Sequence, residues 1–366
     1  MATVVDKVYL DLVKEVLSNG YTYLDEKRGV TCTEISSALI KIPIQNQFPL
    51  ISAKNVHFPS VVEELRWFLS GSENIADLKC GIWDKDAYNL YLRKLAENAP
   101  YMTPVKIEDF VKLKGKAALH VLGTAPYILG DTNYTHYGQV GRIYGAKWKE
   151  GDQLINVLNG LKEQPMGRRH VVDAWSVDNS NVALPCCHYG FQIVPRPLSL
   201  EERLFLFNNA NCDESNAISA GHSRIQEFLD AAMVPKYAFT LKWNQRSTDL
   251  YLGLPFNIAS YALLANIIGN LVNMMPEYIE GNLSHIHIYE NALEACKNLP
   301  LNDIILDYPE VEIADYMVDL TIESIHSFFA NLGDLGAEPF AKLVPGTYNP
   351  VTNAKVNMLA EKIVKP

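Results

Sequence analysis

The segment ALPCCH (residues 183–188) places two adjacent cysteines, Cys186 and Cys187, beside His188. A cysteine next to a histidine at the edge of a strand can act as a nucleophile, because nearby positive charge favours its thiolate. A cysteine outside a recognised motif is more often a small buried hydrophobe. A metal site built from these three residues is disfavoured, because adjacent residues of a strand point to opposite faces. The segment alone leaves a nucleophile and a core residue as open alternatives.

Two arginine motifs are suited to a phosphate group. The segment GRRH (167–170) contains Arg168 and Arg169, and QRS (245–247) contains Arg246 next to Ser247. A guanidinium group offers a planar fork of donors that matches phosphate oxygens, and a serine hydroxyl adds another donor. Each arginine could equally be a solvated surface charge. Because the formal net charge of the chain is -10, these clusters favour a small phosphomonoester as the ligand.

The segment GLPFN (253–257) predicts a turn that delivers Asn257 to the start of an apolar helix. At that place an asparagine side chain most often caps the helix. An amide also carries both a donor and an acceptor, so it can match the N3–H and O4 edge of uracil. The residue type alone favours capping.

The composition is that of an ordinary globular protein, since 48% of the 366 residues are hydrophobic and 20% are charged. The acidic balance argues against a protein that coats DNA or RNA, which normally presents a basic face. The six cysteines are too few and too scattered for a disulfide framework, and no pair has the spacing of a structural zinc site. We therefore expect reduced thiols, a cytoplasmic location, no metal and no nucleic-acid polymer as partner.

Neither the N-terminal run nor the most apolar stretch of the chain predicts contact with a membrane. The N-terminal run MATVVDKVYLDLVKEVL lacks the features of a signal peptide and predicts a first helix. Residues 258–272 are apolar, but Ser260, Asn266, Gly269 and Asn270 interrupt them. A membrane span needs about 20 mostly apolar residues. We predict a buried core helix over about 257–275.

The remaining elements must hold these groups together. FPSVVEELRWFLSG (58–71) predicts a helix closed by Gly71, and residues 152–162 predict another. HVVDAW (170–175), HYGFQIV (188–194) and YAFTLKW (237–243) predict neighbouring strands of a mostly buried sheet, and ISSALIKIPI (35–44) and HIHIY (285–289) predict two more strands. Segments of about 96–137 and 196–236 predict two insertions, the first on the surface. The result is an α+β body, or a layered α/β one, whose strand order the sequence does not give.

Seven blocks of this sequence resemble thymidylate synthases in their order and spacing. They are EELRWFLSGSENI, GIWD, IYGAKW, GRRHVVDAW, LPCCHYGFQ, NQRSTDLYLGLPFNIASYALL and HIHIYENALE. The resemblance covers about residues 24–358 without the two insertions. It implies a single catalytic domain over residues 1–366 and a large mixed β-sheet that is covered by helices and packs against its dimer mate.

The resemblance also implies catalytic roles. Cys187 would attack C6 of the pyrimidine, and Asn257 would read the uracil edge and stabilise charge on O4. Glu64 would act through water as acid and base, and Tyr144 and His188 would belong to the polar network around C5. Positive charge from the phosphate-binding arginines should lower the pKa of the thiol.

The ligand contacts follow in the same way. For dUMP, the resemblance implies Arg246 and Ser247 as phosphate ligands from the same subunit, and Arg168 and Arg169 as ligands donated across an obligate homodimer; Arg28 would be a further one, unless a shift of one residue makes it Lys27. His287 and Tyr289 would bind the ribose 3′-hydroxyl, and Gln192 would contact the nucleotide. For the folate, Trp83, Asp249 and Gly253 would hold the pterin, with Asp249 also serving catalysis, and Lys54 would attract the polyglutamate tail.

The implied reaction transfers a one-carbon unit from 5,10-methylenetetrahydrofolate, the co-substrate, to C5 of dUMP. Reduction of the C5 methylene gives dTMP, whereas entry of water gives 5-hydroxymethyl-dUMP. Retention of Trp83 favours reduction, and dUMP hydroxymethylation is the alternative. A catalytically silent nucleotide- or RNA-binding relative is disfavoured, because such a protein has no need of the complete catalytic set.

Two residues and two segments depart from the family pattern. Cys186 replaces a proline before the nucleophile, which predicts a less rigid backbone there. Ala292 stands where a histidine is usual, and residues 196–236 form an unusually long strand connection. The chain also continues beyond the usual end as EKIVKP (361–366), which predicts an altered closure of the active site.

Overall fold

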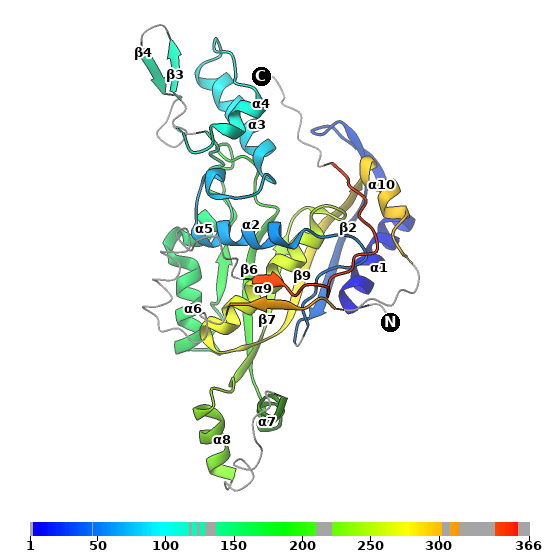
Figure 1. Ribbon diagram of the computed structural model, residues 1–366, viewed down its shortest axis with the longest axis vertical. Coiled ribbons are helices and arrows are strands. Elements are labelled where there is room, and N and C mark those ends of the chain that lie inside the picture. The colour runs from blue at the N-terminus through cyan, green and yellow to red at the C-terminus, as the bar shows by residue number, and fades with distance from the viewer. Residues whose placement is uncertain are drawn as a thin grey trace.

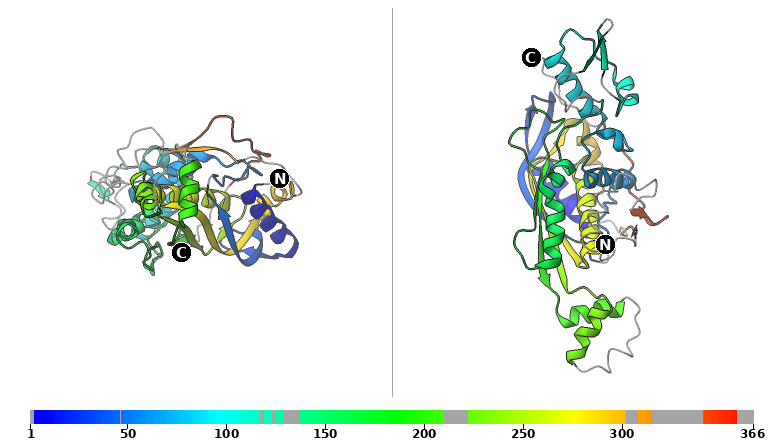
Figure 2. Two further views of the ribbon diagram at one scale, coloured as in Figure 1. Left: turned by 90° about the horizontal axis from the view of Figure 1, so that it is seen from below. Right: turned by 90° about the vertical axis from the view of Figure 1, so that its left-hand side faces the viewer.

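The computed structural model describes residues 3–45, 47–116, 119–122, 125–128, 137–209, 222–301, 308–314 and 341–357. The predicted C-terminal extension at 361–366 lies outside this part of the chain. The described parts form a helix-covered body with projections at its two ends (Figures 1 and 2).

A mixed sheet forms the centre of the body. Its strands are β1 (Tyr21–Asp25), β2 (Val30–Pro43), β5 (Val171–Asp173), β6 (His188–Pro197), β7 (Tyr237–Gln245), β8 (Thr248–Asp249) and β9 (Met275–Tyr289). Within the described residues the order is β1-β2-β9-β7-β6-β5, and β8 also pairs with β9. The pairs β7–β9 and β8–β9 are parallel and the others antiparallel. The predicted mixed sheet is confirmed, as is the adjacency of the three strands β5, β6 and β7.

Helices cover one face of this sheet. The helices that pack against its strands are α1 (Val4–Asn19), α5 (Gly145–Lys149), α6 (Gln153–Glu163), α9 (Leu254–Val272) and α10 (Glu290–Lys297). Helix α2 (Phe58–Ser70) packs on α9 and on α5. Gly71 ends α2 with a φ of 69°, as predicted. The short elements are the 3₁₀ turns η1 (Ile75–Asp77) and η3 (Glu150–Asp152) and the strands β10 (Val311–Ile313) and β11 (Ala341–Leu343).

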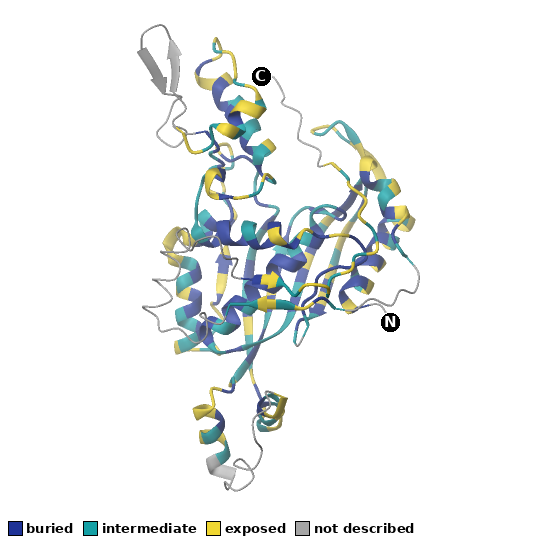
Figure 3. Ribbon diagram, in the orientation of Figure 1, coloured by how far each residue is buried: buried dark blue, intermediate teal, exposed yellow. Residues whose placement is uncertain are grey.

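Helix α9 is the centre of the hydrophobic core. By length and composition alone it could cross a membrane, but 78% of its most apolar window is buried inside the protein. It lies between the sheet and α2, and Figure 3 shows its buried residues in dark blue. The prediction of a core helix here is confirmed.

The uncovered face of the sheet exposes apolar side chains. On β2, Ile40 and Ile42 are buried, whereas Leu39, which directly precedes Ile40, is 74% exposed. Val171 of β5 and Val194 of β6 are also exposed. The strands are therefore buried on one face only in the single chain, which is less burial than their apolar sequences predict.

The two projections contain the segments predicted as insertions. At one end lie α3 (Asp84–Asn98), α4 (Ile107–Lys112) and the hairpin of β3 (Leu119–Leu122) and β4 (Ala125–Ile128). Phe110 and Tyr137 are buried there against the rings of Tyr88 and Tyr91. The prediction that this segment lies on the surface is therefore wrong for its aromatic residues, which extend the core.

At the other end β6 and β7 extend beyond the body to α7 (Leu200–Asn209) and α8 (His222–Ala231). Phe207, Leu229 and Val234 form a small separate core between these helices. Arg196 joins this end to the sheet by ion pairs with Glu202 and Glu277.

The contact between α2 and α5 fixes the backbone at Tyr144. A Cβ atom on Gly145 would lie 1.7 Å from the carbonyl oxygen of Phe68, so no other residue fits at this position. Tyr144 has a φ of 41°, which is strained for a residue with a side chain. Its ring stacks on Phe68 with centroids 4.7 Å apart. The close approach of the two helices therefore holds the Tyr144 ring in place.

We predict that Gly145→Ala destabilises the protein by about 3 kcal/mol or more, because the added methyl group must separate α2 from α5. Gly151→Asn is the matched control, since that position has a φ of 65° and open space around its Cβ, and asparagine tolerates this conformation. Urea unfolding of both variants measures the difference. Equal stability of the two variants would contradict the steric argument.

Candidate active site

One pocket gathers most of the residues predicted to carry chemistry. Its volume is about 220 Å³, and it opens between α2, the start of α3, the start of α9 and the ends of β6, β7 and β9. The predicted residues that line it are Arg28, Glu64, Trp83, Tyr144, Cys187, His188, Ser247, Asp249, Gly253, Asn257, His287 and Tyr289.

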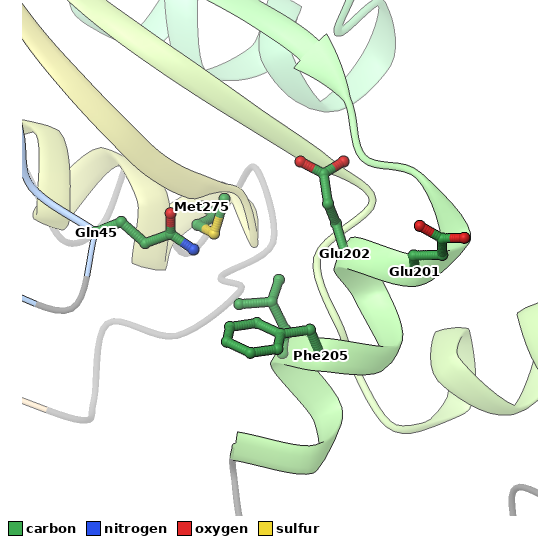
Figure 4. A pocket seen from close by; sticks show the side chains of 6 residues that line it. Gln45, Glu201, Glu202, Phe205 and Met275 are labelled. Atoms are coloured by element: carbon green, nitrogen blue, oxygen red, sulfur yellow. The ribbon is translucent and has the colours of Figure 1, made fainter.

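A second hollow lies at the projecting end of the molecule, between α7 and the start of β9 (Figure 4). Its lining consists of Gln45, Glu201, Glu202, Phe205, Leu206 and Met275. None of these six is a cysteine, histidine or arginine, and Glu202 is already paired with Arg196. The nucleophile and the candidate bases therefore belong to the first pocket.

Cys187 follows a loop and directly precedes β6. Its backbone N–H donates a hydrogen bond to the phenol oxygen of Tyr144, at 2.8 Å. Burial raises the pKa of the Cys187 thiol above its ordinary value, and the charges of Arg246 and Arg28 only partly offset this effect. The expectation of a lowered pKa is wrong for the single chain, because desolvation outweighs the two arginines.

Cys186 and His188 support the nucleophile from either side. The backbone N–H of Tyr144 donates a hydrogen bond to the Cys186 sulfur at 3.2 Å. The cysteine at the position of the usual proline therefore adds a contact that holds this backbone in place. His188 shares a hydrogen bond of 2.8 Å between Nδ1 and the Tyr261 hydroxyl. Burial lowers the pKa of His188 to about 3, so its ring is neutral at pH 7.

Glu64 lies on α2 and faces the same space. Burial raises the pKa of its carboxyl to about 7, while a hydrogen bond of 2.8 Å donated by the Trp83 indole to Oε1 opposes the rise. A carboxyl group with this pKa can both donate and accept a proton at neutral pH. Because Trp83 contacts only one of its oxygens, the other can serve a ligand or a water molecule.

Asn257 lies one turn into α9, whose first residue is Leu254 and whose N-cap is Gly253. The expectation that Asn257 caps the helix is therefore wrong. Its Oδ1 accepts a hydrogen bond of 3.1 Å from Nε2 of Gln245, and Oε1 of Gln245 accepts one from the Trp243 indole. The Trp243 donor fixes the amide of Gln245, which in turn fixes that of Asn257. The Asn257 NH₂ group is left to donate into the pocket.

Cationic and aromatic groups occupy the other end of the pocket. The Arg28 guanidinium lies over the Tyr289 ring, 5.2 Å from its centroid, and the Tyr289 and His287 rings meet edge to face. Lys27 is not among the lining residues, so the structure favours Arg28 of the two alternatives. Arg246 adjoins the pocket without lining it, because its guanidinium donates to the carbonyls of Pro185 and Cys186.

Asp249 and Gly253 form the turn that leads into α9. Oδ1 of Asp249 accepts hydrogen bonds from the backbone N–H groups of Tyr251 and Leu252. A Cβ atom on Gly253 would lie 3.0 Å from the Asp249 carbonyl oxygen, so the turn has little room for a larger residue.

Four predicted residues lie away from the pocket. Arg168 and Arg169 are exposed and line a separate hollow near His170. Gln192 lies on β6 opposite Val171, which is exposed on the uncovered face of the sheet. Lys54 is buried, its Nζ donates to the Tyr251 carbonyl at 2.6 Å, and burial lowers the pKa of Lys54 to about 8. Its ammonium group therefore faces the protein interior rather than a ligand tail.

Six further residues line the pocket that were not predicted from the sequence: Gln245, Asp86 and the apolar residues Ile82, Leu184, Leu252 and Phe256. Gln245 directly precedes Arg246. Each apolar residue lies within a recognised block, and Ile82, Leu252 and Phe256 are next to a predicted residue. Asp86, in the first turn of α3, follows the block GIWD by two residues. Proximity to a recognised block was the only feature of the sequence that could have indicated these lining residues.

Comparisons with known proteins point to a single family. A sequence model of the family described as "Thymidylate synthase" matches residues 7–328. A protein of Escherichia phage T5 named probable thymidylate synthase is 31% identical over 292 residues, which are 78% of this chain and 80% of the phage protein. The thymidylate synthase of Enterobacteria phage T4 is 30% identical over 80% of each chain, and that of Listeria innocua is 29% identical over 86% of this chain and 95% of its own.

The family match extends over most of the chain, and the pocket holds the cysteine, glutamate, tyrosine and asparagine of the matched blocks. The chain therefore belongs to the thymidylate synthase family.

Proposed function

We propose that this pocket binds dUMP and that Cys187 begins the reductive methylation of dUMP to dTMP with 5,10-methylenetetrahydrofolate, the reaction of the family. The observation that carries the proposal is the presence of a thiol, an amide donor and a carboxyl group of pKa about 7 in one pocket. A silent binding protein would not need this combination.

The nucleotide would lie with its phosphate toward Arg28, Ser247 and the free N–H groups of Arg246. Two carbonyls take two of the five donors of Arg246, so others remain for phosphate oxygens. The ribose would meet His287 and Tyr289, and the uracil edge would meet Asn257. Binding energy from the phosphate then orients the ring over the sulfur.

Addition of the Cys187 sulfur to C6 moves an electron pair through C5 toward O4. The Asn257 NH₂ group, which Gln245 orients, donates a hydrogen bond to O4 as negative charge develops there. The second lone pair of Asn257 Oδ1 can accept from the uracil N3–H. Cytosine presents an amino group and an unprotonated N3 at these places, so the arrangement favours uracil.

Glu64 would manage protons at O4 and at the folate through water. Its pKa of about 7 lets it hold a proton in one step and release it in another. The phenol oxygen of Tyr144 accepts from Cys187 N–H, and its O–H also stabilises the Cys187 thiolate, so this hydroxyl would act next to the reacting sulfur. The neutral His188 ring extends this network without adding charge.

The opposite wall of the pocket suits the folate. Ile82, Trp83, Leu252 and Phe256 offer an apolar surface for a flat ring system, with Asp249 as a polar partner. When bound there, the folate supplies the one-carbon unit and then the hydride. Lys54 would reach a polyglutamate tail only after leaving the Tyr251 carbonyl, so its predicted role has no support from the contacts.

In a homodimer, the second subunit would cover the exposed face of the sheet and add two arginines to the phosphate site. The uncovered face of the sheet exposes Leu39, Val171 and Val194, as expected of a surface that another subunit covers. Arg168 and Arg169 are exposed and lie outside their own pocket, so they are available to a neighbour's phosphate. Their added charge would also favour the thiolate of Cys187, whose pKa burial raises in the single chain.

Hydroxymethylation of dUMP is a second candidate, favoured by Asp86 on the pocket wall. A carboxylate near the reacting carbon can hold a water molecule that adds to the C5 methylene. Product analysis separates the two reactions. The synthase gives dTMP and dihydrofolate, whereas the hydroxymethylase gives 5-hydroxymethyl-dUMP and tetrahydrofolate.

The proposed function predicts a covalent complex with 5-fluoro-dUMP and methylenetetrahydrofolate, because fluorine at C5 cannot leave as a proton does. Mass spectrometry should detect the adduct on the native protein and on Cys186→Ser, but not on Cys187→Ser. A native protein without an adduct would support a silent binding protein instead.

We predict that Trp83→Phe raises the pKa of Glu64 from about 7, because the variant loses the indole donor that stabilises the carboxylate. A shift of about one pH unit is expected from the loss of one hydrogen bond to a charged group. The pH dependence of kcat/KM measures it, with Trp148→Phe as control. An unmoved or lowered value would show that the indole does not tune Glu64.

A dimer in which Arg168 serves the partner predicts complementation. Arg168→Ala and Cys187→Ser subunits, each of low activity, should together regain about a quarter of wild-type activity after random mixing, since each hybrid has one intact site. Arg246→Ala mixed with Cys187→Ser should regain none, because both residues belong to the same site. Equal behaviour of the two mixtures, with exchange confirmed, would refute donation across the interface.

A further inference from the structure

A cluster of three buried side chains lies where β2 pairs with β9. Cys32, Glu34 and His287 each offer one ligand atom, and these atoms all lie within 4.8 Å of one another. Glu34 is directly opposite His287 in the antiparallel register, and Cys32 is opposite Tyr289. The three residues are only 2%, 1% and 5% exposed.

Hydrogen bonds from neighbouring groups orient the side chains of the cluster, as is usual for metal ligands. Nδ1 of His287 lies 2.7 Å from the His285 carbonyl oxygen, so this nitrogen carries the proton and Nε2 is left to bind. Glu34 accepts hydrogen bonds from the hydroxyls of Tyr21 and Tyr23 and shares one with His285. A carboxylate can accept about four such contacts, so Glu34 keeps capacity for one more ligand.

We propose that Cys32, Glu34 and His287 form a Zn²⁺ site. A thiolate, an imidazole and a carboxylate are the ligand types that zinc binds, whereas Mg²⁺ and Ca²⁺ require oxygen ligands. Three protein ligands leave one coordination position open, which water can fill. No metal was expected from the spacing of the cysteines, since the three ligands come from two strands far apart in the chain.

The site shares one residue with the nucleotide pocket, since His287 lines both. On the proposed function, His287 contacts the ribose 3′-hydroxyl, and its single free nitrogen cannot bind zinc and the hydroxyl together. Zinc should therefore compete with dUMP. The proposed activity itself does not depend on the metal.

Cobalt(II) gives a direct optical test, because a cysteine thiolate bound to it produces charge-transfer absorption in the near ultraviolet. The Cys187→Ser protein, which lacks the reactive thiol, should bind Co²⁺ with this absorption, and Cys187→Ser/Cys32→Ser should lose it. Cys187→Ser/Cys296→Ser is the control for a buried cysteine outside the cluster and should keep it. Persistence of the band without Cys32 would overturn the site.

A second variant tests the site without changing a buried residue, because a substitution at Cys32 could prevent folding. Tyr23→Phe, on an exposed part of β1, removes a hydrogen bond to Glu34 and one to Cys32 while retaining all three ligands. Loss of such supporting contacts lowers metal affinity by about 10-fold or more. An affinity equal to that of the parent protein would contradict a metal site at this cluster.

Steady-state kinetics test the competition. With Zn²⁺ added, KM for dUMP should rise while kcat stays constant, and Cys32→Ser should show wild-type turnover without the rise. Zinc inhibition that is unchanged in Cys32→Ser, or a fall in kcat alone, would contradict the proposal. Turnover without metal reports separately on the proposed function, so the two can fail independently.

Discussion

The hydrogen bond from the Cys187 backbone N–H to the Tyr144 phenol oxygen joins the parts of this active site. It requires the Tyr144 ring to lie flat on Phe68, which α2 and α5 allow only because residue 145 is glycine. The sulfur of Cys186 holds the Tyr144 backbone from the other side. The Cys187 thiol, which directly precedes β6, is thus positioned by helices that are distant in the sequence.

The side chains of Asn257, Glu64 and His188 share one feature. Each has a hydrogen bond to one protein partner and retains a second donor or acceptor atom that a ligand could contact. Gln245 orients Asn257, the Trp83 indole contacts Glu64, and Tyr261 contacts His188. These contacts fix the groups before substrate binds, so little reorganisation is needed when charge develops. Burial sets their protonation, since it raises the pKa of Glu64 to about 7 and lowers that of His188 to about 3.

Local patterns in the sequence predicted the elements whose formation depends on neighbouring residues in the chain. The apolar run of α9, the glycine that ends α2 and the strands around Cys187 were all recognisable, and most pocket residues lie in the recognised blocks. The residue type of Asn257 alone favoured a helix cap, because its actual partner, Gln245, comes from another element. The direction of the Cys187 pKa shift was also wrong, because it depends on desolvation by the surrounding fold. Pairing of β2 with β9 likewise creates the Cys32–Glu34–His287 cluster, which no single stretch of sequence contains.

The most direct test of the account is a crystal structure of the protein with dUMP. We expect the uracil edge against the Asn257 amide, the phosphate among guanidinium groups, and C6 within bonding reach of the Cys187 sulfur. A nucleotide bound with its base turned away from residue 187, or with its phosphate in contact with none of the arginines, would contradict it.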